Sequence, residues 1–567
     1  MQLTRNATRK SKRRPFYLIA APMLWCLSSS AAHALDAVSL FVNQCLEYND
    51  NFSADFSDAT TLERQTLGLQ NLNDRVQYYR QFQLSSDDQE WLLQCQLAVA
   101  TTTTKLLHAP ELTTLIEQLA TSSQPQQRAL AARYRYFQQQ QFNDADKIRL
   151  TTAQTAIKQR LSSSSFQLDF GSCALGSPAD EAQPFDQSIA RYLMAQPDED
   201  CRYKVWSAFQ TRAVDTVKAD LATLTDIRDE LAQAQGFHNY AELQFQHTLI
   251  GNANNTKAFL QAMQQSVVVT PWNIGQQLRT AAKTPFAQLS QAAYLQQLTA
   301  ALATLGVRLE TINHEWLRLW HQQRLLGDVM LTSGKPMALL LRRSVVGHQT
   351  GISYLSLPAD FSRPAQVKRA NNAMAEMLAT MAASGRYSLL NEFAAESDTQ
   401  YLAQDWLAHY LDQQLAVNYA ANSREALFQQ YQQQFERINA LAALKFYTED
   451  RSINLSHEFA ASFGRDWPQA ALLPFTFPGI ADAGPLYFSH LLQQQLSSEL
   501  MQHTQNCDAA LLFNRIVVNE QQQDVAQLLQ QIWPEGMAGF IAQLADEPSA
   551  NTDNADSHQA VCPLTAK

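Results

Sequence analysis

The sequence predicts a mainly α-helical globular protein, and three observations support this fold class. Only 17 of the 567 residues are glycine, which disfavours an all-β chain with many tight turns. Apolar residues recur three and four positions apart through most of the chain, as they do in amphipathic helices. Hydrophobic residues make up 46% and charged residues 17%, which is typical of a folded domain and not of a disordered chain.

Residues 1–34 are predicted to be a signal peptide. The apolar stretch Phe16–Leu27 follows a group of basic residues and is too short to span a membrane comfortably. Ala32–Ala34 has the small-x-small pattern of a cleavage site. Lipidation at Cys26 is the alternative, which the bulky Trp25 before it disfavours. The basic residues that precede the apolar stretch are Arg5, Arg9, Lys10, Lys12, Arg13 and Arg14.

Export would leave a strongly acidic chain. The removal of residues 1–34 takes away six basic and no acidic residues, so the formal net charge moves from -10 to -16. Such a chain repels nucleic acid and anionic membrane surfaces. We therefore expect a periplasmic or secreted protein, without a nucleic-acid partner and without a membrane span after signal cleavage.

The six cysteines after residue 34 predict disulfides, because the count is even and the chain is predicted to be exported. Spacing cannot choose among the possible pairings, and isolated buried thiols are the alternative. The expected pairing joins sequence neighbours: Cys45 with Cys95, Cys173 with Cys201, and Cys507 with Cys562.

The chain is expected to begin, after the signal peptide, with an N-terminal helical region over residues 35–185. Helical periodicity is clear at 112–142, 217–237 and 408–420. A break is predicted at Gly176–Pro184, and a second helical domain is expected over residues 186–545.

One region of the chain has a different pattern. Residues 327–361 contain short β-type runs separated by Gly, Ser and Pro. They predict a small sheet with strands at Pro336–Val345 and Gly351–Leu357 and a turn near Gly347. The polar residues 546–567 are predicted to form a loose tail.

Histidine spacing gives little evidence for a metal site. His457 and Glu458 are the first half of an H-E-x-x-H zinc motif, but the position of its second histidine is occupied by Ala461. His314 and His321 are expected to share a helix face. Seven residues of helix separate them by about 10 Å, so both rings could not reach one zinc ion.

A longer segment resembles a known family. Residues Cys201–Leu243 read CRYKVWSAFQTRAVDTVKADLATLTDIRDELAQAQGFHNYAEL. This segment is similar to the paired helices of the thimet oligopeptidase and oligopeptidase A family of zinc metallopeptidases, across Tyr203–Ala213 and Ile227–Glu242. The resemblance implies a zincin-related helical body with a deep channel and a small β-sheet.

The resemblance also implies where zinc would bind. The family's H-E-F-G-H motif falls on the predicted helix Gln366–Gly385, with Ala375 and Ala379 at the two histidine positions. Glu376 matches the general base, and Gln400 stands at the position of the glutamate ligand. This member of the family is therefore expected to be degenerate, with no zinc ligand left and Glu376 vestigial.

The substrate-binding loop of the family is matched only in part. Phe477–Leu500 resembles the family's Gly- and Tyr-rich loop and the helix that follows it. Gly484 persists there, and Tyr487 and Phe488 are the nearest aromatic residues to the expected tyrosines. The resemblance assigns these three residues to substrate binding, while the missing tyrosines weaken the expected oxyanion stabilisation.

These observations favour a non-catalytic pseudopeptidase that binds peptides or acts as an adaptor, without a cofactor and as a monomer. The partner would be a peptide or another protein. The alternative is an active zinc oligopeptidase with atypical ligands, drawn from His457, Glu458, Asp466 and Glu449. An unrelated helical binding protein is the third interpretation.

Overall fold

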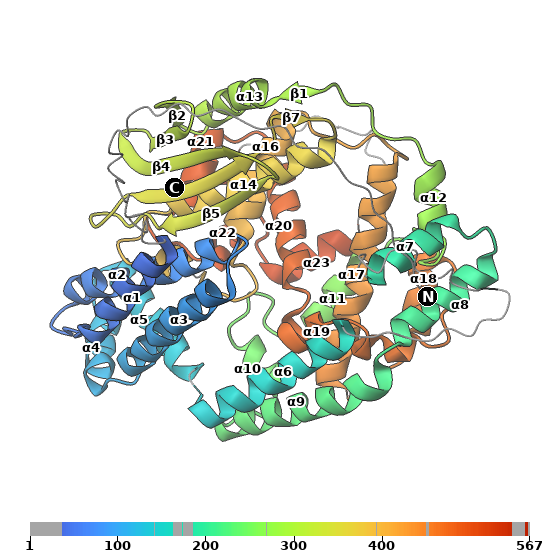
Figure 1. The fold of residues 1–567 in the computed structure, drawn as a ribbon, viewed down its shortest axis with the longest axis horizontal. Coiled ribbons are helices and arrows are strands. Elements are labelled where there is room, and N and C mark those ends of the chain that lie inside the picture. Colours follow the sequence, from blue (N-terminus) through green and yellow to red (C-terminus); the bar gives the residue numbers. More distant parts are fainter. Residues whose placement is uncertain are drawn as a thin grey trace, which may run out of the picture.

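The computed structural model describes residues 37–140, 142–162, 173, 185–267, 269–392, 394–449, 453–546 and 562–564. Helices make up most of these residues, and one small sheet lies on one side of them (Figure 1). The predicted fold class, mainly α with a small sheet, is therefore confirmed. The predicted signal peptide, the predicted break at 176–184 and most of the predicted tail lie outside the described residues.

Five helices form the N-terminal region, which lies below the sheet in Figure 1. The periodicity predicted for 112–142 corresponds to the last two of them. Four of the five helices begin with residues that favour a helix N-terminus. Asp58 and Ser85 cap two of them, and proline is the first residue of two others. The five helices are α1 (Ala37–Asp50), α2 (Ala59–Tyr79), α3 (Ser86–Leu107), α4 (Pro110–Ala120) and α5 (Pro125–Gln139).

Helices α6 to α13 carry the chain across the lower and right side of Figure 1 to the sheet. Within this group α6 packs along α9, and Ile157 of α6 joins the large core of the rest of the chain. The helices are α6 (Asp144–Ser162), α7 (Phe185–Ala195), α8 (Glu199–Thr211), α9 (Val214–Ala234), α10 (Tyr240–Phe245), α11 (Ala253–Ala262), α12 (Ile274–Thr280) and α13 (Gln291–Ala303).

The small sheet has five strands in the order β2-β3-β4-β6-β5. Only the pair β4–β6 is parallel, and the other neighbours are antiparallel. The two predicted strands correspond to β5 and β6. The strands are β2 (Val307–Thr311), β3 (Trp316–His321), β4 (Arg324–Ser333), β5 (Met337–Arg342) and β6 (Gly351–Leu357), and a separate two-stranded sheet joins β1 (Leu289–Ser290) to β7 (Asp360–Phe361).

The sheet begins earlier in the chain than the sequence predicted, and one expectation was wrong. His314 and His321 do not share a helix face, because Trp316–His321 is strand β3. Its residues alternate between half-buried and buried, and His321 is among the buried ones. An alternation of this kind, with a period of two, is typical of a β-strand. The spacing of the two histidines led to the prediction of a helix instead.

The remaining helices pack behind the sheet and down the centre of the molecule (Figure 1). The predicted helix at 366–385 corresponds to α14. The α-helices are α14 (Pro364–Ala382), α15 (Ser388–Glu392), α16 (Leu402–Gln414), α17 (Arg424–Thr448), α18 (Ser456–Phe463), α19 (Gly479–Asp482), α20 (Ser489–His503), α21 (Ala509–Phe513), α22 (Val525–Gln530) and α23 (Met537–Asp546). Short 3-10 turns lie at Ala470–Phe475 and Gly484–Leu486, and a π-helical turn at Asn514–Val518.

The close pairing of β4 with β6 depends on a glycine. A Cβ atom at Gly327 of β4 would lie 2.2 Å from the carbonyl oxygen of Gly351 and 2.4 Å from Cε of Met381. Gly351 belongs to the neighbouring strand β6, so a side chain at position 327 would clash with the backbone of that strand, and glycine is needed for the close pairing of β4 with β6.

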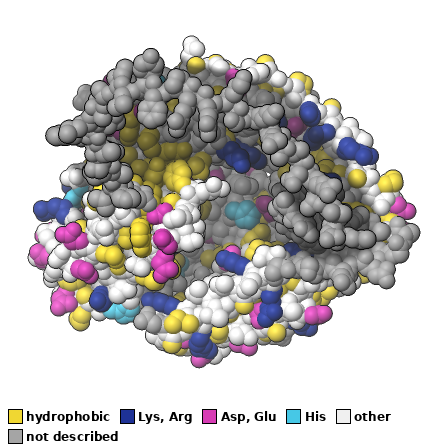
Figure 2. All heavy atoms as spheres, in the orientation of Figure 1, with side chains coloured by type: hydrophobic (Ala, Val, Ile, Leu, Met, Phe, Trp, Pro, Cys, Tyr) yellow, Lys and Arg dark blue, Asp and Glu magenta, His cyan; other side chains and the backbone are white. Residues whose placement is uncertain are grey.

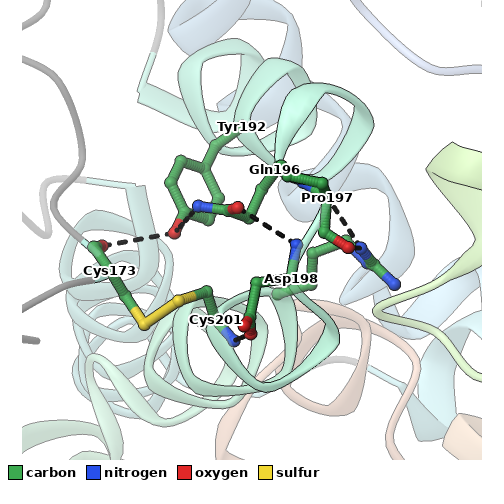
Figure 3. The surroundings of a disulfide bond; sticks show 7 residues. Cys173, Tyr192, Gln196, Pro197, Asp198 and Cys201 are labelled. Carbon is green, nitrogen blue, oxygen red and sulfur yellow. Dashed lines mark hydrogen bonds between the residues drawn. A yellow bond between two sulfur atoms is a disulfide. The ribbon is translucent and has the colours of Figure 1, made fainter.

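All three predicted disulfides are confirmed: Cys45–Cys95, Cys173–Cys201 and Cys507–Cys562. The second bond fastens Cys173 to the first turn of α8, where Asp198 caps the helix by accepting from the backbone N–H of Cys201 (Figure 3). The hydroxyl of Tyr192 donates to the carbonyl oxygen of Cys173 across the same junction. Within the described residues, no helix has the length and apolar content to cross a membrane.

Candidate functional site

Helix α14 presents the residues for which the sequence predicted a lost zinc site. Pro364 begins the helix, and its apolar face packs against the sheet and α16. At its end, Arg324 of β4 donates to the carbonyl oxygens of Ala382 and Ala383, at 3.1 and 2.9 Å. A cation at these carbonyls stabilises the end of the helix.

The start of α16 is held in place by a buried carboxylate. Asp398 is fully buried and accepts from the backbone N–H groups of Leu249 and Ile250, at 2.7 and 3.1 Å. The backbone N–H of Tyr401 donates to the side chain of Gln493 on α20. These bonds fix the segment that contains Gln400 against two other parts of the fold.

A pocket of about 570 Å³ opens between α14, α16 and the N-terminal helices. Glu376, Ala379 and Gln400 all line it, so three of the four positions singled out by the resemblance lie at one cavity. Ala375 is fully buried in the core and is not in the lining. Further lining residues include Ala129, Ala132 and Arg133 of α5, Thr380 of α14, Ala383 directly after α14, Thr399, Tyr401 and Gln404 around the start of α16, Glu396, and the segment around Arg515, Gln522, Gln523 and Asp524.

Two carboxyl groups in this pocket hold their protons more tightly than usual. Desolvation raises the pKa of Glu376, although solvent reaches the side chain from the pocket. Burial raises the pKa of Glu396 to about 7, with a smaller contribution from Asp524. One carboxylate oxygen of Glu396 is buried without a hydrogen-bond partner in the described part of the chain.

No motif in the sequence indicated that Glu396, Arg133 and Asp524 would meet at this pocket. They come from the segment before α16, from α5 and from the turn before α22. Burial lowers the pKa of the Arg133 guanidinium, while Glu396 acts in the opposite direction. The pocket thus combines carboxyl groups, a guanidinium and several glutamine amides.

The residues at the expected ligand positions do not fit zinc. Ala375 and Ala379 have no donor atom, and the amide of Gln400 is a neutral, weak ligand. Among all the residues that the structure describes, no group of three His, Cys, Asp or Glu side chains could hold a metal ion. The assignment of these positions to a former zinc site rests on the resemblance and stays a prediction.

The residues of the alternative zinc site do not line this pocket. His457 is exposed in the first turn of α18, and Glu458 forms an ion pair with Lys445 at 3.0 Å. Glu449 forms an ion pair with Lys257 at 3.4 Å, and Asp466 is exposed. Glu458 and Glu449 therefore each have a lysine partner.

The three residues assigned to substrate binding also lie outside the pocket lining. Gly484 has φ +56° and packs near Arg228 and Tyr240. Phe488 is fully buried and stacks on Phe245, with ring centroids 6.2 Å apart. Tyr487 packs against Phe477 and His490, so the substrate-binding role of all three stays a prediction.

A network that the sequence did not indicate holds the loop around Gly484. Arg228 of α9 donates to the hydroxyl of Tyr447 at 2.5 Å and to the carbonyl oxygen of Ala481 at 2.6 Å. Tyr447 in turn donates to the carbonyl oxygen of Ile480 at 3.1 Å. Buried donors of this kind satisfy loop carbonyls that would otherwise lack a partner.

The space-filling view shows that the molecule is hollowed at the centre of one face, with basic and histidine side chains in its wall (Figure 2). The pocket beside α14 is partly open to solvent and is not a sealed cavity.

No protein-family model matches the chain, and no curated protein matches it. Among solved structures, the chain is similar to a carboxypeptidase from Pyrococcus furiosus in its apo-Mg form, with a TM-score of 0.48 and 10% sequence identity. The match covers 89% of this chain and 98% of the carboxypeptidase. A likeness of this degree identifies neither a family nor an activity.

Proposed function

We propose that this chain is an exported, non-catalytic peptide-binding protein, related to the metallopeptidases that its residues 201–243 resemble. The observation that carries the proposal is the pocket beside α14. The resemblance assigns Glu376 to the general base and Ala379 and Gln400 to two of the zinc ligands, and all three residues line this one pocket. The cleft therefore keeps Glu376 as the proposed former general base but offers no set of zinc ligands.

Hydrolysis by this family's chemistry needs a metal-bound water. Three protein ligands hold the ion, and the general base takes a proton from the water that the ion polarises. Ala375, Ala379 and Gln400 offer no such set, and Glu376 alone activates nothing. Binding is the part of the function that these residues still support.

The lining suits a peptide. A peptide backbone offers both N–H donors and carbonyl acceptors, and the side-chain amides of Gln400, Gln404 and Gln522 supply both kinds of group. The pocket volume of about 570 Å³ lies in the usual range for small-ligand sites. The alanine residues of α5 and α14 leave room for bound side chains.

Three disulfides support the exported location in the proposal, because such bonds persist in oxidising compartments. A periplasmic or secreted peptide-binding protein would meet peptides released outside the cytoplasm.

The test combines metal analysis, cleavage and binding on the purified chain without residues 1–34. We expect no stoichiometric zinc after incubation with zinc and dialysis, and no chelator-sensitive cleavage of fluorogenic peptides. We also expect saturable binding of labelled peptides, measured by fluorescence anisotropy. Ala379→Trp should abolish this binding, because the indole fills the pocket, whereas Ala303→Trp on the exposed end of α13 should not.

Two outcomes would contradict the proposal. Stoichiometric zinc with chelator-sensitive cleavage would establish the active-enzyme alternative, and His457→Ala would then show whether His457 binds the metal. Equal peptide affinity in Ala379→Trp and Ala303→Trp would place peptide binding outside this pocket.

A further inference from the structure

One acidic side chain in the pocket beside α14 has no partner among the described residues. Glu376 lines this pocket and is exposed. Its carboxylate forms no hydrogen bond or ion pair in the described part of the chain, and only its backbone carbonyl oxygen accepts from a side chain, the hydroxyl of Thr380, at 2.9 Å. Asn372 and Thr380, the neighbours one turn away on the helix, are both neutral. A ligand that enters the pocket can therefore reach a carboxylate that is not already engaged.

The other charged side chains that line the pocket each have a partner. The partners are ion pairs, hydrogen bonds or, for one pair, an attraction between opposite charges. They join Arg343 to Asp74 and Glu392, Arg515 to Gln523, Asp524 to the backbone N–H of Gln527, and Glu396 to Arg133. Glu376 thus carries the negative charge of the lining that no described residue compensates.

The surroundings of Glu376 disfavour an isolated negative charge. Desolvation raises the pKa of Glu376, and no neighbouring charge contributes to this shift. A cation beside the carboxylate acts in the opposite direction, because an opposite charge favours the ionised form. The pocket therefore favours a ligand that brings a positive charge with it.

We propose that the pocket selects peptides that carry a positive charge, and that the carboxylate of Glu376 binds this charge. The inference rests on the proposed peptide-binding function and specifies the class of peptide. An ammonium group suits the position, because it is compact, carries three N–H donors and forms charge-assisted hydrogen bonds with a carboxylate. The residue that the resemblance assigns to a general base serves here as an anchor for the peptide.

Two parts of a peptide offer this chemistry. A free N-terminus and a lysine side chain both end in an ammonium group, and the experiment separates these two sources. The formal net charge of the chain, -10, attracts either kind of peptide from a distance.

The test measures the binding of four fluorescent pentapeptides to the purified chain without residues 1–34, by fluorescence anisotropy at pH 8. All four consist of alanine and glycine around a variable central residue, with an uncharged fluorophore at the C-terminus. One peptide has a free N-terminus and a central glutamine. The other three are N-acetylated and have glutamine, lysine or glutamate at the centre.

The neutral peptide, acetylated with a central glutamine, is the reference. We expect a free N-terminus or a central lysine to raise the affinity about tenfold or more over this reference, because each adds a charge-assisted bond. The glutamate peptide should bind most weakly. An increase for only one of the two positive peptides identifies the source of the ammonium group.

Substitutions of Glu376 test its role as the anchor. Glu376→Gln should remove most of the preference for a positive charge and leave the affinity for the neutral peptide almost unchanged. Glu376→Lys should reverse the preference and favour the glutamate peptide, which a general loss of structure would not do. The control Glu90→Gln removes the same charge from an exposed position of α3 outside the pocket lining and should keep the wild-type preference. Circular dichroism checks the fold of each variant.

Three results would overturn the inference, and they separate it from the proposed function. Equal affinity of the wild type for neutral and positive peptides, with binding abolished by Ala379→Trp, would leave a peptide-binding pocket that does not select charge. An unchanged preference in Glu376→Gln would place the anchor at another residue. No binding of any of the four peptides would overturn the inference and the proposed function together.

Discussion

The guanidinium of Arg343 lies 2.5 Å from the carboxylate of Asp74, and both side chains are almost completely buried. Arg343 follows strand β5, whereas Asp74 belongs to α2. Glu392 of α15 accepts from the same guanidinium. This buried cluster therefore joins the N-terminal helices to the sheet and the helices behind it.

Removal of the arginine should destabilise the chain strongly. Arg343→Met leaves two carboxylates without a partner, and the loss of one member of a buried ion pair typically costs about 3–5 kcal/mol. Denaturant unfolding followed by circular dichroism measures the change. Arg308→Met, which breaks an exposed pair with Glu310, should change stability by no more than about 1 kcal/mol. Similar losses in the two variants would contradict a structural role for the cluster.

The sequence predicted the helices well, because their evidence is local. The periodicity at 217–237 corresponds to α9, and the helix that the resemblance placed at 366–385 corresponds to α14. The expected pairing of cysteines that are neighbours in the sequence is also confirmed. Strand β3 was missed, although its buried residues alternate, because two histidines seven residues apart suggested a helix face.

The composition of the pocket was much harder to predict than its location. Glu376 and Gln400 were expected to lie near each other, since the resemblance placed them at one site. Arg133 and Glu396 also meet there, although they are far apart in sequence and share no motif. Contacts of this kind depend on tertiary packing, which no local pattern encodes.

Glu396 should make stability depend on pH. Its pKa is raised from 4.5 to about 7 in the folded protein, so the folded state binds this proton more tightly than the unfolded chain. This group therefore lowers the stability of the wild type progressively as the pH rises from 4.5 to about 7. Glu396→Gln removes that loss, and the variant should be more stable than the wild type at pH 8 by about 1–2 kcal/mol.

At pH 3 the difference between Glu396→Gln and the wild type should vanish, because the carboxyl group is then protonated in both states. Thermal unfolding across this pH range measures the effect. Glu117→Gln on the exposed face of α4 serves as the control, with no change in the pH profile expected. A constant difference at all pH values would show that the amide acts through packing and not through the proton.

The disulfide Cys45–Cys95 should stabilise the first three helices locally. It closes a separation of 50 residues between α1 and α3, and both sulfurs are buried. Replacing both cysteines by serine should cost about 2–4 kcal/mol. Hydrogen exchange should show faster exchange in α1 to α3, whereas Cys507→Ser/Cys562→Ser should leave exchange there unchanged. Equal effects of the two double variants on these helices would exclude a local role.

The proposed loss of a zinc site predicts that the site can be restored. Positions 375 and 379 lie one turn apart on α14, so two histidines there would face the same way, and Gln400 lines the pocket beside Ala379. The triple variant Ala375→His/Ala379→His/Gln400→Glu should bind one zinc per chain, measured by mass spectrometry of the metal content.

This variant also has a structural cost, because Ala375 is fully buried and a larger side chain there overpacks the core by about 1–3 kcal/mol. Zinc should recover part of that loss, since binding to the folded state alone stabilises it. We therefore expect a melting temperature below that of the wild type without zinc and a clear rise when zinc is added. Ala379→His/Gln400→Glu, with only two ligands, should show little rise. A folded triple variant that binds no more zinc than this control would place the former metal site elsewhere and would remove the main reason to interpret Glu376 as a vestigial base.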